Sequence, residues 1–288
     1  MELNLKINKT VSVKLSGHNY PISVSGDGFP SLAIGIGTLM QRTFSQKFKT
    51  SFKVFSSDLY WIKNNEFEEP PTLSMPQIID DIEELRQHLG LTSYILIGHS
   101  AYGIVALEYA KKYGSTLKGI VMIGTPLNSN PEVAACNNKY FETYAEPLRK
   151  QIDFERRTLF ANEDLSHLDP AARFLRTYIW RDAPRYWHDP IFDCTPLWSN
   201  IHLNGPLLDH FFEAILPNTD VTIGLEKVQC PVFLAAGMSD YDCCPWMWSQ
   251  INNFSKLTVS LFNKSGHYPN YEESELFDTR VKLWANSL

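Results

Sequence analysis

The sequence lacks a long apolar run. No stretch of the 288 residues stays apolar for the roughly 18 positions that a membrane-spanning helix needs. Residues 1–6 alternate polar and apolar side chains and lack the apolar centre of a signal peptide. We therefore expect a cytoplasmic protein without a membrane partner.

Basic residues are scarce relative to acidic ones. The chain contains 26 Lys and Arg against 32 Asp and Glu, which gives a formal net charge of −6 and a pI near 5.8. Proteins that bind nucleic acid usually carry an excess of positive charge on one face. The composition therefore argues against a nucleic-acid partner.

The cysteines are few and form no metal-binding motif. The five are Cys136, Cys194, Cys230, Cys243 and Cys244, and none belongs to a Cys-x-x-Cys pair. Neither a zinc site nor a disulfide framework is indicated, and we expect no metal or organic cofactor. An odd number of scattered cysteines favours free thiols, and whether Cys243 and Cys244 are ever oxidised stays open.

What the sequence does contain is an alternation of buried strands and amphipathic helices. Near-continuous apolar runs at 31–37, 94–98, 117–124 and 231–237 are typical of parallel strands that are covered on both faces. Residues 75–89 carry apolar side chains at helical spacing after a Ser-Met-Pro-Gln start. This order predicts an α/β fold with a doubly wound, mostly parallel sheet.

The alternation breaks between residues 128 and 218, a stretch that is helical in character and rich in aromatic residues. Such an insertion, lying over the carboxyl ends of the strands, would cover an active site and supply its apolar walls. Most of its aromatic rings are nevertheless expected to form its own core. We divide the chain into an α/β core, residues 1–127 and 219–288, and a helical cap insertion, residues 128–218.

The sequence around Ser100 predicts a strand, a sharp turn and a helix. An apolar strand reaches Gly98, and a helical pattern starts directly after Ser100, with Gly103 in its first turn. A serine at such a turn has its hydroxyl lifted away from the sheet, next to the unpaired N–H groups of a helix N-terminus. The alternative is an ordinary helix N-cap, a frequent position for serine.

An acid and a histidine follow later in the chain, each directly after an apolar strand. Because the carboxyl ends of parallel strands meet at one edge of the sheet, Ser100, Asp240 and His267 are expected to converge. Ser100 would be the nucleophile, His267 the general base and Asp240 the residue that orients the imidazole. Asp242 is a rival for Asp240, and His99 is expected to pack rather than to act as the base.

Two backbone N–H groups are expected to bind an oxyanion. Ala101 begins the helix after Ser100, and Thr38 follows the strand at 31–37, where a second donor is commonly found. We also predict that Tyr102 and Tyr241, which lie near or next to these catalytic candidates, bind substrate.

These motifs together resemble the α/β-hydrolase superfamily with a helical cap, and the resemblance covers nearly the whole chain. It is carried by Gly-His-Ser-Ala-Tyr-Gly at 98–103, Ile-Gly-Thr at 36–38, the strand and loop at 231–240, and Ser-Gly-His-Tyr-Pro at 265–269. The pattern Gly-x-x-Asp-Tyr at 237–241 is most similar to the branch that contains proline iminopeptidases and related esterases. The resemblance implies a Ser-His-Asp triad.

Three features depart from the family pattern. Ile36 stands where the family usually has the histidine before its oxyanion loop, and Tyr102 stands where it has the second glycine of Gly-x-Ser-x-Gly. The Gly-Gly-Ser-Trp-Gly pattern of proline iminopeptidases is absent, which weakens a peptidase assignment.

The combined expectation is a serine hydrolase that cleaves a small, fairly apolar ester or amide through an acyl-enzyme. Carboxylesterase activity comes first, an aminopeptidase activity like that of proline iminopeptidases second, and hydrolysis of a carbon–carbon bond third. A ligand-sensing signalling protein on the same fold is an alternative from another class, because a fold does not by itself determine a function. We expect a monomer or a homodimer.

Overall fold

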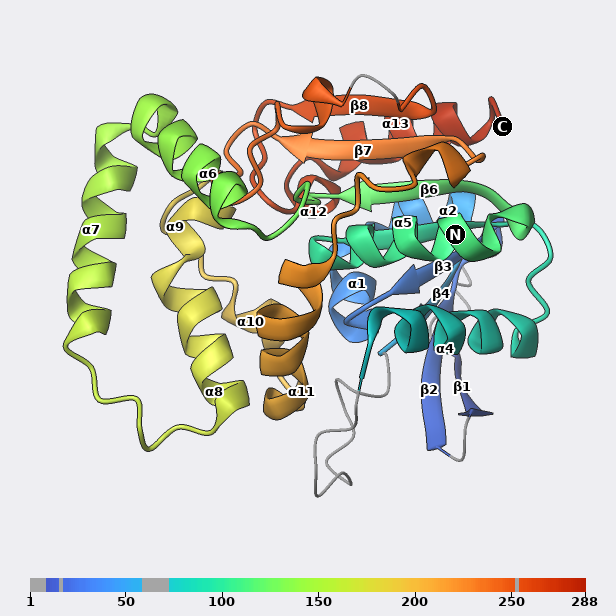
Figure 1. Cartoon of the computed structure of the whole chain (residues 1–288), viewed down its shortest axis with the longest axis horizontal. Helices are drawn as coiled ribbons and strands as arrows, with labels where there is room; N and C mark the ends of the chain where they lie inside the picture. The colour runs from blue at the N-terminus through green and yellow to red at the C-terminus, as the bar shows by residue number, and fades with distance from the viewer. Residues whose placement is uncertain (1–8, 16–17, 59–72, 252–253) are drawn as a thin grey trace, which may run out of the picture.

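The computed structural model describes residues 9–15, 18–58, 73–251 and 254–288, and an eight-stranded sheet lies at its centre (Figure 1). The strand order is β1-β2-β4-β3-β5-β6-β7-β8. β2 is antiparallel to both of its neighbours, and all other pairs are parallel. The predicted α/β fold with a mostly parallel sheet is therefore confirmed. The strands are β1 (Lys9–Leu15), β2 (His18–Ser25), β3 (Phe29–Ile34), β4 (Phe52–Ser57), β5 (Tyr94–His99), β6 (Leu117–Ile123), β7 (Val232–Gly237) and β8 (Leu257–Phe262).

Helices cover both faces of the sheet. Those of the core are α1 (Gly37–Thr43), α2 (Gln46–Ser51), α4 (Met75–His88), α5 (Ala101–Tyr113), α12 (Pro269–Glu272) and α13 (Ser274–Ala285), with short 3₁₀ turns η1 (Gly114–Thr116), η5 (Leu225–Lys227) and η6 (Trp248–Gln250). No helix in the described part of the chain combines the length and the apolar character needed to cross a membrane.

Strand β5 shows why both faces of the sheet must be covered by helices. All six of its residues are buried. Tyr94 and Leu96 pack in the cluster that includes α4 and α5, whereas Ile95 and Ile97 pack in the cluster formed with α1, α2 and α13. Burial of each large aliphatic side chain contributes about 1.5–3 kcal/mol, so a central strand without polar faces is stable only between two helical layers.

The helix predicted at 75–89 forms as α4. The Ser74 side chain accepts a hydrogen bond from the Gln77 N–H at 3.5 Å, and a proline lies in the first turn. Ile78, Ile82 and Leu85 are buried against the sheet. The capping and the spacing of apolar residues therefore account for both the start and the orientation of this helix.

Between β6 and β7 the chain, which is described there without a gap, forms only helices and turns. We call residues 131–218 the helical insertion; its elements are α6 (Pro131–Tyr144), α7 (Pro147–Ala161), α8 (Pro170–Leu175), the π-helical η2 (Arg176–Arg181), α9 (Ala183–Tyr186), α10 (Thr195–Trp198), α11 (Gly205–His210), the π-helical η3 (Phe211–Ile215) and the 3₁₀ turn η4 (Leu216–Asn218). The insertion lies at the end of the sheet toward which the arrows of β6 and β7 point (Figure 1).

The structure describes part of the N-terminal range in which the sequence predicts strands. The alternation of polar and apolar residues predicts strands over residues 3–25, and β1 and β2 account for the described part of this range. Residues 3–8 and 16–17, which carry the rest of that prediction, lie outside the described residues.

Arg149 ties α7 to the segment that follows α9. Its side chain is only 1% exposed, and its guanidinium donates to the carbonyls of Pro184, Trp187 (2.7 Å) and His188 (2.6 Å). Glu146 accepts a further hydrogen bond from Nε at 3.0 Å. A single buried cation thus satisfies carbonyls within and directly after a short helix, where the helix itself supplies no donors.

We expect Arg149→Ala to lower the free energy of unfolding by about 3 kcal/mol, because buried carbonyls lose their donor and a cavity remains. Urea denaturation followed by circular dichroism would measure the change. Lys139→Ala, on the exposed side of α6, is the control and should change stability by less than about 0.5 kcal/mol. An equal effect of both substitutions would contradict this account of the insertion.

Candidate active site

Ser100 forms the turn between β5 and α5. Its backbone has φ 55° and ψ −131°, and its side chain makes no capping hydrogen bond. Among the described residues, Asn200 is the only other non-glycine residue with a positive φ. Such a conformation costs on the order of 1–3 kcal/mol and persists only where the surroundings hold it. The alternative that Ser100 is an ordinary N-cap is therefore wrong.

Neighbouring backbone holds this turn in place. The Ser100 N–H donates to the Ile123 carbonyl of β6 at 2.8 Å, and the Gly103 N–H donates to the Ser100 carbonyl at 2.9 Å. A Cβ at Gly98 would lie 2.3 Å from the Tyr102 carbonyl oxygen. Glycine is required at position 98 because the helix starts so close to the strand it leaves.

His267 and Asp240 form a buried pair. His267 Nδ1 lies 2.7 Å from Asp240 Oδ2, and each residue is 1% exposed. Asp240 Oδ1 accepts the N–H groups of Asp242 (3.2 Å) and Cys243 (3.0 Å), which hold the carboxylate in position. Burial lowers the pKa of His267, but the nearby carboxylates, with Asp240 first and Asp242 and Glu272 after it, together outweigh burial and raise that pKa above its usual value.

The other imidazole nitrogen of His267 is free for chemistry. His267 Nε2 is buried and makes no hydrogen bond with any described residue, and none joins it to Ser100 Oγ. Ser100 is nonetheless adjacent in sequence to His99, whose ring centroid lies 4.7 Å from that of His267. The structure therefore brings the two loops together but leaves the nucleophile and the base unjoined in this state; catalytic hydrogen bonds often tighten only when substrate is bound.

The two rival residues have other partners. Asp242 Oδ2 accepts the Tyr186 hydroxyl at 3.2 Å rather than a hydrogen bond from His267. His99 Nε2 lies 3.0 Å from the His267 carbonyl oxygen. Burial and the neighbouring His267 hold the pKa of His99 well below its usual value, so His99 stays neutral and packs between the loops.

The oxyanion prediction needs one correction. The Thr38 N–H donates to Asp58 Oδ1 at 3.0 Å, and the Thr38 hydroxyl donates to Asp58 Oδ2 at 3.1 Å. An N–H that is donated to a carboxylate does not face a substrate, so Thr38 is wrong as an oxyanion donor. Ile36, two residues earlier, lines a cavity together with Ser100 and Ala101.

Two cavities meet at Ser100 and Ala101. The small cavity has a volume of about 50 Å³ and is mostly apolar; its walls not shared with the other cavity are Ile34, Ile36, Leu39, Met40, His99, Tyr102, Trp198 and Tyr268. The large cavity has a volume of about 490 Å³. Phe174, Tyr178 and Phe212 of the helical insertion line both cavities, so the insertion covers the reaction centre.

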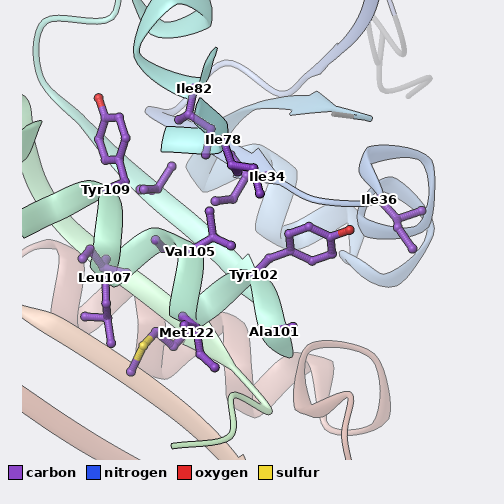
Figure 2. Packing of buried hydrophobic residues seen from close by; sticks show 14 of the residues in the cluster. Ile34, Ile36, Ile78, Ile82, Ala101, Tyr102, Val105, Leu107, Tyr109 and Met122 are labelled. Carbon is purple, nitrogen blue, oxygen red and sulfur yellow. The ribbon is translucent and has the colours of Figure 1, made fainter. Parts of the chain in front are cut away.

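Of the two tyrosines predicted to bind substrate, only Tyr102 is suitably placed. Tyr102 lines the small cavity, and its ring extends toward Ile36 (Figure 2). Gly35 makes room for it, because a Cβ there would lie 2.5 Å from the ring. Tyr241 lines neither of these two cavities and packs against Phe141, so the structure gives its prediction no support.

Part of the wall of the large cavity is charged. Arg157 and Arg181 both pair with Asp182, at 2.9 and 2.7 Å. Arg185 pairs with Asp153 at 3.0 Å. These three arginines and Asp182 line the large cavity, which therefore has both apolar and charged walls.

The described residues contain one group whose atoms are close enough to hold a metal. Ligand atoms of Asp240, Cys243 and His267 lie within 4.8 Å of one another. Two of these residues are already hydrogen bonded to each other, and burial raises the pKa of the Cys243 thiol well above its usual value. The group fits a catalytic pair better than a metal centre. Cys243 and Cys244 are free thiols here.

Sequence reasoning missed two residues that shape the site. The Tyr186 carbonyl accepts the His267 N–H at 2.6 Å, and the two ring centroids lie 5.1 Å apart; no local signal could have revealed this long-range contact. Asp58, which binds Thr38, directly follows an apolar strand and could have been noticed for that reason.

Comparison with known proteins agrees with this architecture. A family model described as alpha/beta hydrolase fold matches residues 40–274. The AB hydrolase superfamily protein YclE of Bacillus subtilis (strain 168) is 26% identical over 271 residues, which covers 93% of this chain and 95% of YclE. A proline iminopeptidase of Chitinophaga pinensis is 25% identical and covers 84% of this chain and 83% of its own length. The structure of a thermophilic esterase from Thermogutta terrifontis superposes with a TM-score of 0.67 at 19% identity, covering 97% of this chain and 98% of the esterase.

We expect Asp240→Asn to lower the pKa of His267, because the substitution removes the carboxylate that contributes most to raising this pKa while burial, which lowers it, remains. Titration of the imidazole signals by NMR would measure the shift. Asp242→Asn should lower the pKa by a smaller amount, since Asp242 acts without a hydrogen bond. A larger shift in the Asp242 variant would reverse the assignment of the two acids.

Proposed function

Since the chain belongs to the α/β-hydrolase family, we propose that it is a serine hydrolase that cleaves a small carboxylic ester, or an amide, through an acyl-enzyme. The observation that carries this proposal is a strained serine at the carboxyl end of β5 near a buried histidine–carboxylate pair. Strain of this kind is kept in proteins mainly where it serves a site. A triad of Ser100, His267 and Asp240 is the arrangement that uses all of these features.

In this mechanism Ser100 attacks the substrate carbonyl carbon while His267 Nε2 removes the hydroxyl proton. Asp240 holds the proton on Nδ1, which keeps Nε2 as an acceptor, and it stabilises the imidazolium that forms. The backbone N–H groups of Ala101 and Ile36 receive the negative charge on the carbonyl oxygen, each contributing on the order of 3 kcal/mol in the transition state.

The tetrahedral intermediate then collapses. The carbon–oxygen or carbon–nitrogen bond to the leaving group breaks, and His267 donates its Nε2 proton to the departing atom. Water repeats the sequence on the acyl-enzyme: His267 removes a proton from water as the water oxygen bonds to the acyl carbon, the acyl–Ser100 bond then breaks, and the proton returns to the serine oxygen. A carboxylic acid leaves, and no cofactor is consumed.

The two cavities provide separate spaces for the acyl group and the leaving group of a substrate. His267 has neighbours in both cavities: Tyr186, Asp242 and Cys243 line only the large cavity, whereas His99 and Tyr268 line only the small one. We place the leaving group, which takes the proton from His267, in the larger space of the large cavity. The acyl group then occupies the small cavity. One water needs roughly 10–15 Å³ on the same measure, so this cavity of about 50 Å³ suits an acyl chain of only a few carbon atoms.

An aminopeptidase is the second candidate, and Asp242 is the observation that favours it. Asp242 lines the large cavity and makes no ion pair with a described residue, so it could bind a substrate amine. Desolvation by the surrounding protein and the nearby Asp240 raise its pKa, which favours the uncharged carboxyl and works against this role. The acids of the insertion are less suitable: Glu146 and Asp153 pair with arginines, and neither lines a cavity at Ser100.

We expect continuous hydrolysis of short p-nitrophenyl esters and a loss of at least about a thousandfold in kcat for Ser100→Ala, because the nucleophile is removed. Ser129→Ala, in the wall of the large cavity, is the control and should stay active. Proline p-nitroanilide tested beside the esters would separate peptidase from esterase. A burst of one or a few turnovers that then stops would instead indicate a ligand-sensing protein.

We expect kcat/KM in a series of p-nitrophenyl esters to be highest for short acyl chains and to fall as the chain outgrows the small cavity. Leu39→Ala, which enlarges that cavity, should shift the optimum to longer chains. Asn138→Ala, in the large cavity, should leave the optimum unchanged. If Asn138→Ala shifts the optimal acyl chain length instead, the acyl group occupies the large cavity and the leaving group the small one.

A further inference from the structure

Glu272 joins two parts of the molecule that are distant in sequence. Its Oε2 accepts the Gly266 N–H and its Oε1 accepts the His188 N–H, both at 2.7 Å. Gly266 precedes the proposed general base, whereas His188 lies in the helical insertion. One carboxylate therefore bridges the catalytic histidine loop and the insertion, with a separate oxygen for each.

The same two segments touch directly beside this bridge. The His267 N–H donates to the Tyr186 carbonyl at 2.6 Å. A Cβ at Gly266 would lie 2.1 Å from the same carbonyl oxygen, so the loop backbone rests on the backbone of the insertion without an intervening side chain. Displacement of this segment would therefore displace the imidazole.

A third connection joins His188 to the loop that carries Asp240. His188 Nδ1 lies 2.9 Å from Ser239 Oγ, and the Ser239 N–H donates to the Ser265 carbonyl at 2.9 Å. Residues 186–188 thus contact both loops that carry the buried pair of Asp240 and His267.

Residues 186–188 are in turn anchored to the rest of the insertion. Arg149 of α7 donates to the carbonyls of Trp187 and His188, and the Trp187 ring stacks on Tyr268 with centroids 4.6 Å apart. The connection from α7 to the imidazole is therefore continuous: Arg149, residues 186–188, Glu272 and the loop of His267.

The environment of Glu272 indicates more than a packing role. Burial raises the pKa of this carboxyl to about 7, against the opposing effect of its backbone N–H donors. A glutamine would avoid that cost of burial but would present one acceptor oxygen instead of two. In this structure each of the two Glu272 oxygens accepts a backbone N–H.

We propose that Glu272 is a positioning residue that couples the helical insertion to the general base, so that the approach of His267 to Ser100 depends on where residues 186–188 lie. The proposal rests on the function proposed above for His267.

The test compares Glu272→Gln with Glu275→Gln, which removes a charge from the exposed first turn of α13. We expect Glu272→Gln to lower kcat about tenfold with KM within about twofold, because a small displacement of a catalytic group slows chemistry more than binding. The rate at which a fluorophosphonate labels Ser100 should fall by the same factor. Glu275→Gln should match the wild type in both assays.

NMR provides a readout that needs no turnover. The Glu272 charge by itself raises the pKa of His267, so the informative variant is Glu272→Asp, which keeps the charge but shortens the reach. The His267 imidazole signals should shift in Glu272→Asp and stay unchanged in Glu275→Gln. Unchanged His267 signals in a folded Glu272→Asp protein, even one of lower stability, together with an unchanged kcat in Glu272→Gln, would overturn the coupling. If Glu272→Gln does not fold, Glu272→Asp takes its place in the kinetic and labelling assays with the same expectations. Failure of the proposed function is a separate result: the Ser100→Ala variant would retain hydrolysis.

Discussion

The hydrogen bond from the Ser100 N–H to the Ile123 carbonyl holds a turn that an isolated chain would not keep. The positive φ of Ser100 opposes folding locally by on the order of 1–3 kcal/mol. The six buried residues of β5 and the packing of α5 behind them more than offset this cost. Because the strand and helix are both deeply buried, the strained residue between them cannot relax, and its side chain stays at the sheet edge.

Because the strands are parallel, Asp240 and His267 lie at the same edge of the sheet as Ser100. β5, β7 and β8 run in the same direction, so the loops after them emerge together. Asp240 and His267 come from two of these loops and are buried where they meet. The helical insertion contributes more than cavity walls, because it also contacts the backbone of the His267 loop.

The corrections share one physical cause. Thr38 and Tyr241 were placed near the reaction centre by their neighbours in sequence, yet Thr38 is hydrogen bonded to Asp58 and Tyr241 packs against Phe141. A backbone N–H or an aromatic ring takes whichever partner the folded chain offers. Sequence position limits where such a group lies but does not choose its partner. Tyr186 shows the converse, a long-range contact without any local pattern.

The sequence by itself determined the order of strands and helices, the turn at Ser100 and the candidates for the acid and the base, because apolar periodicity and glycine placement act locally. Tertiary structure decided the rest: that His267 pairs with Asp240 rather than Asp242, that two unequal cavities flank Ser100, and that Glu272 joins the insertion to the histidine loop. These outcomes depend on distances between segments far apart in the chain, and such distances exist only after packing.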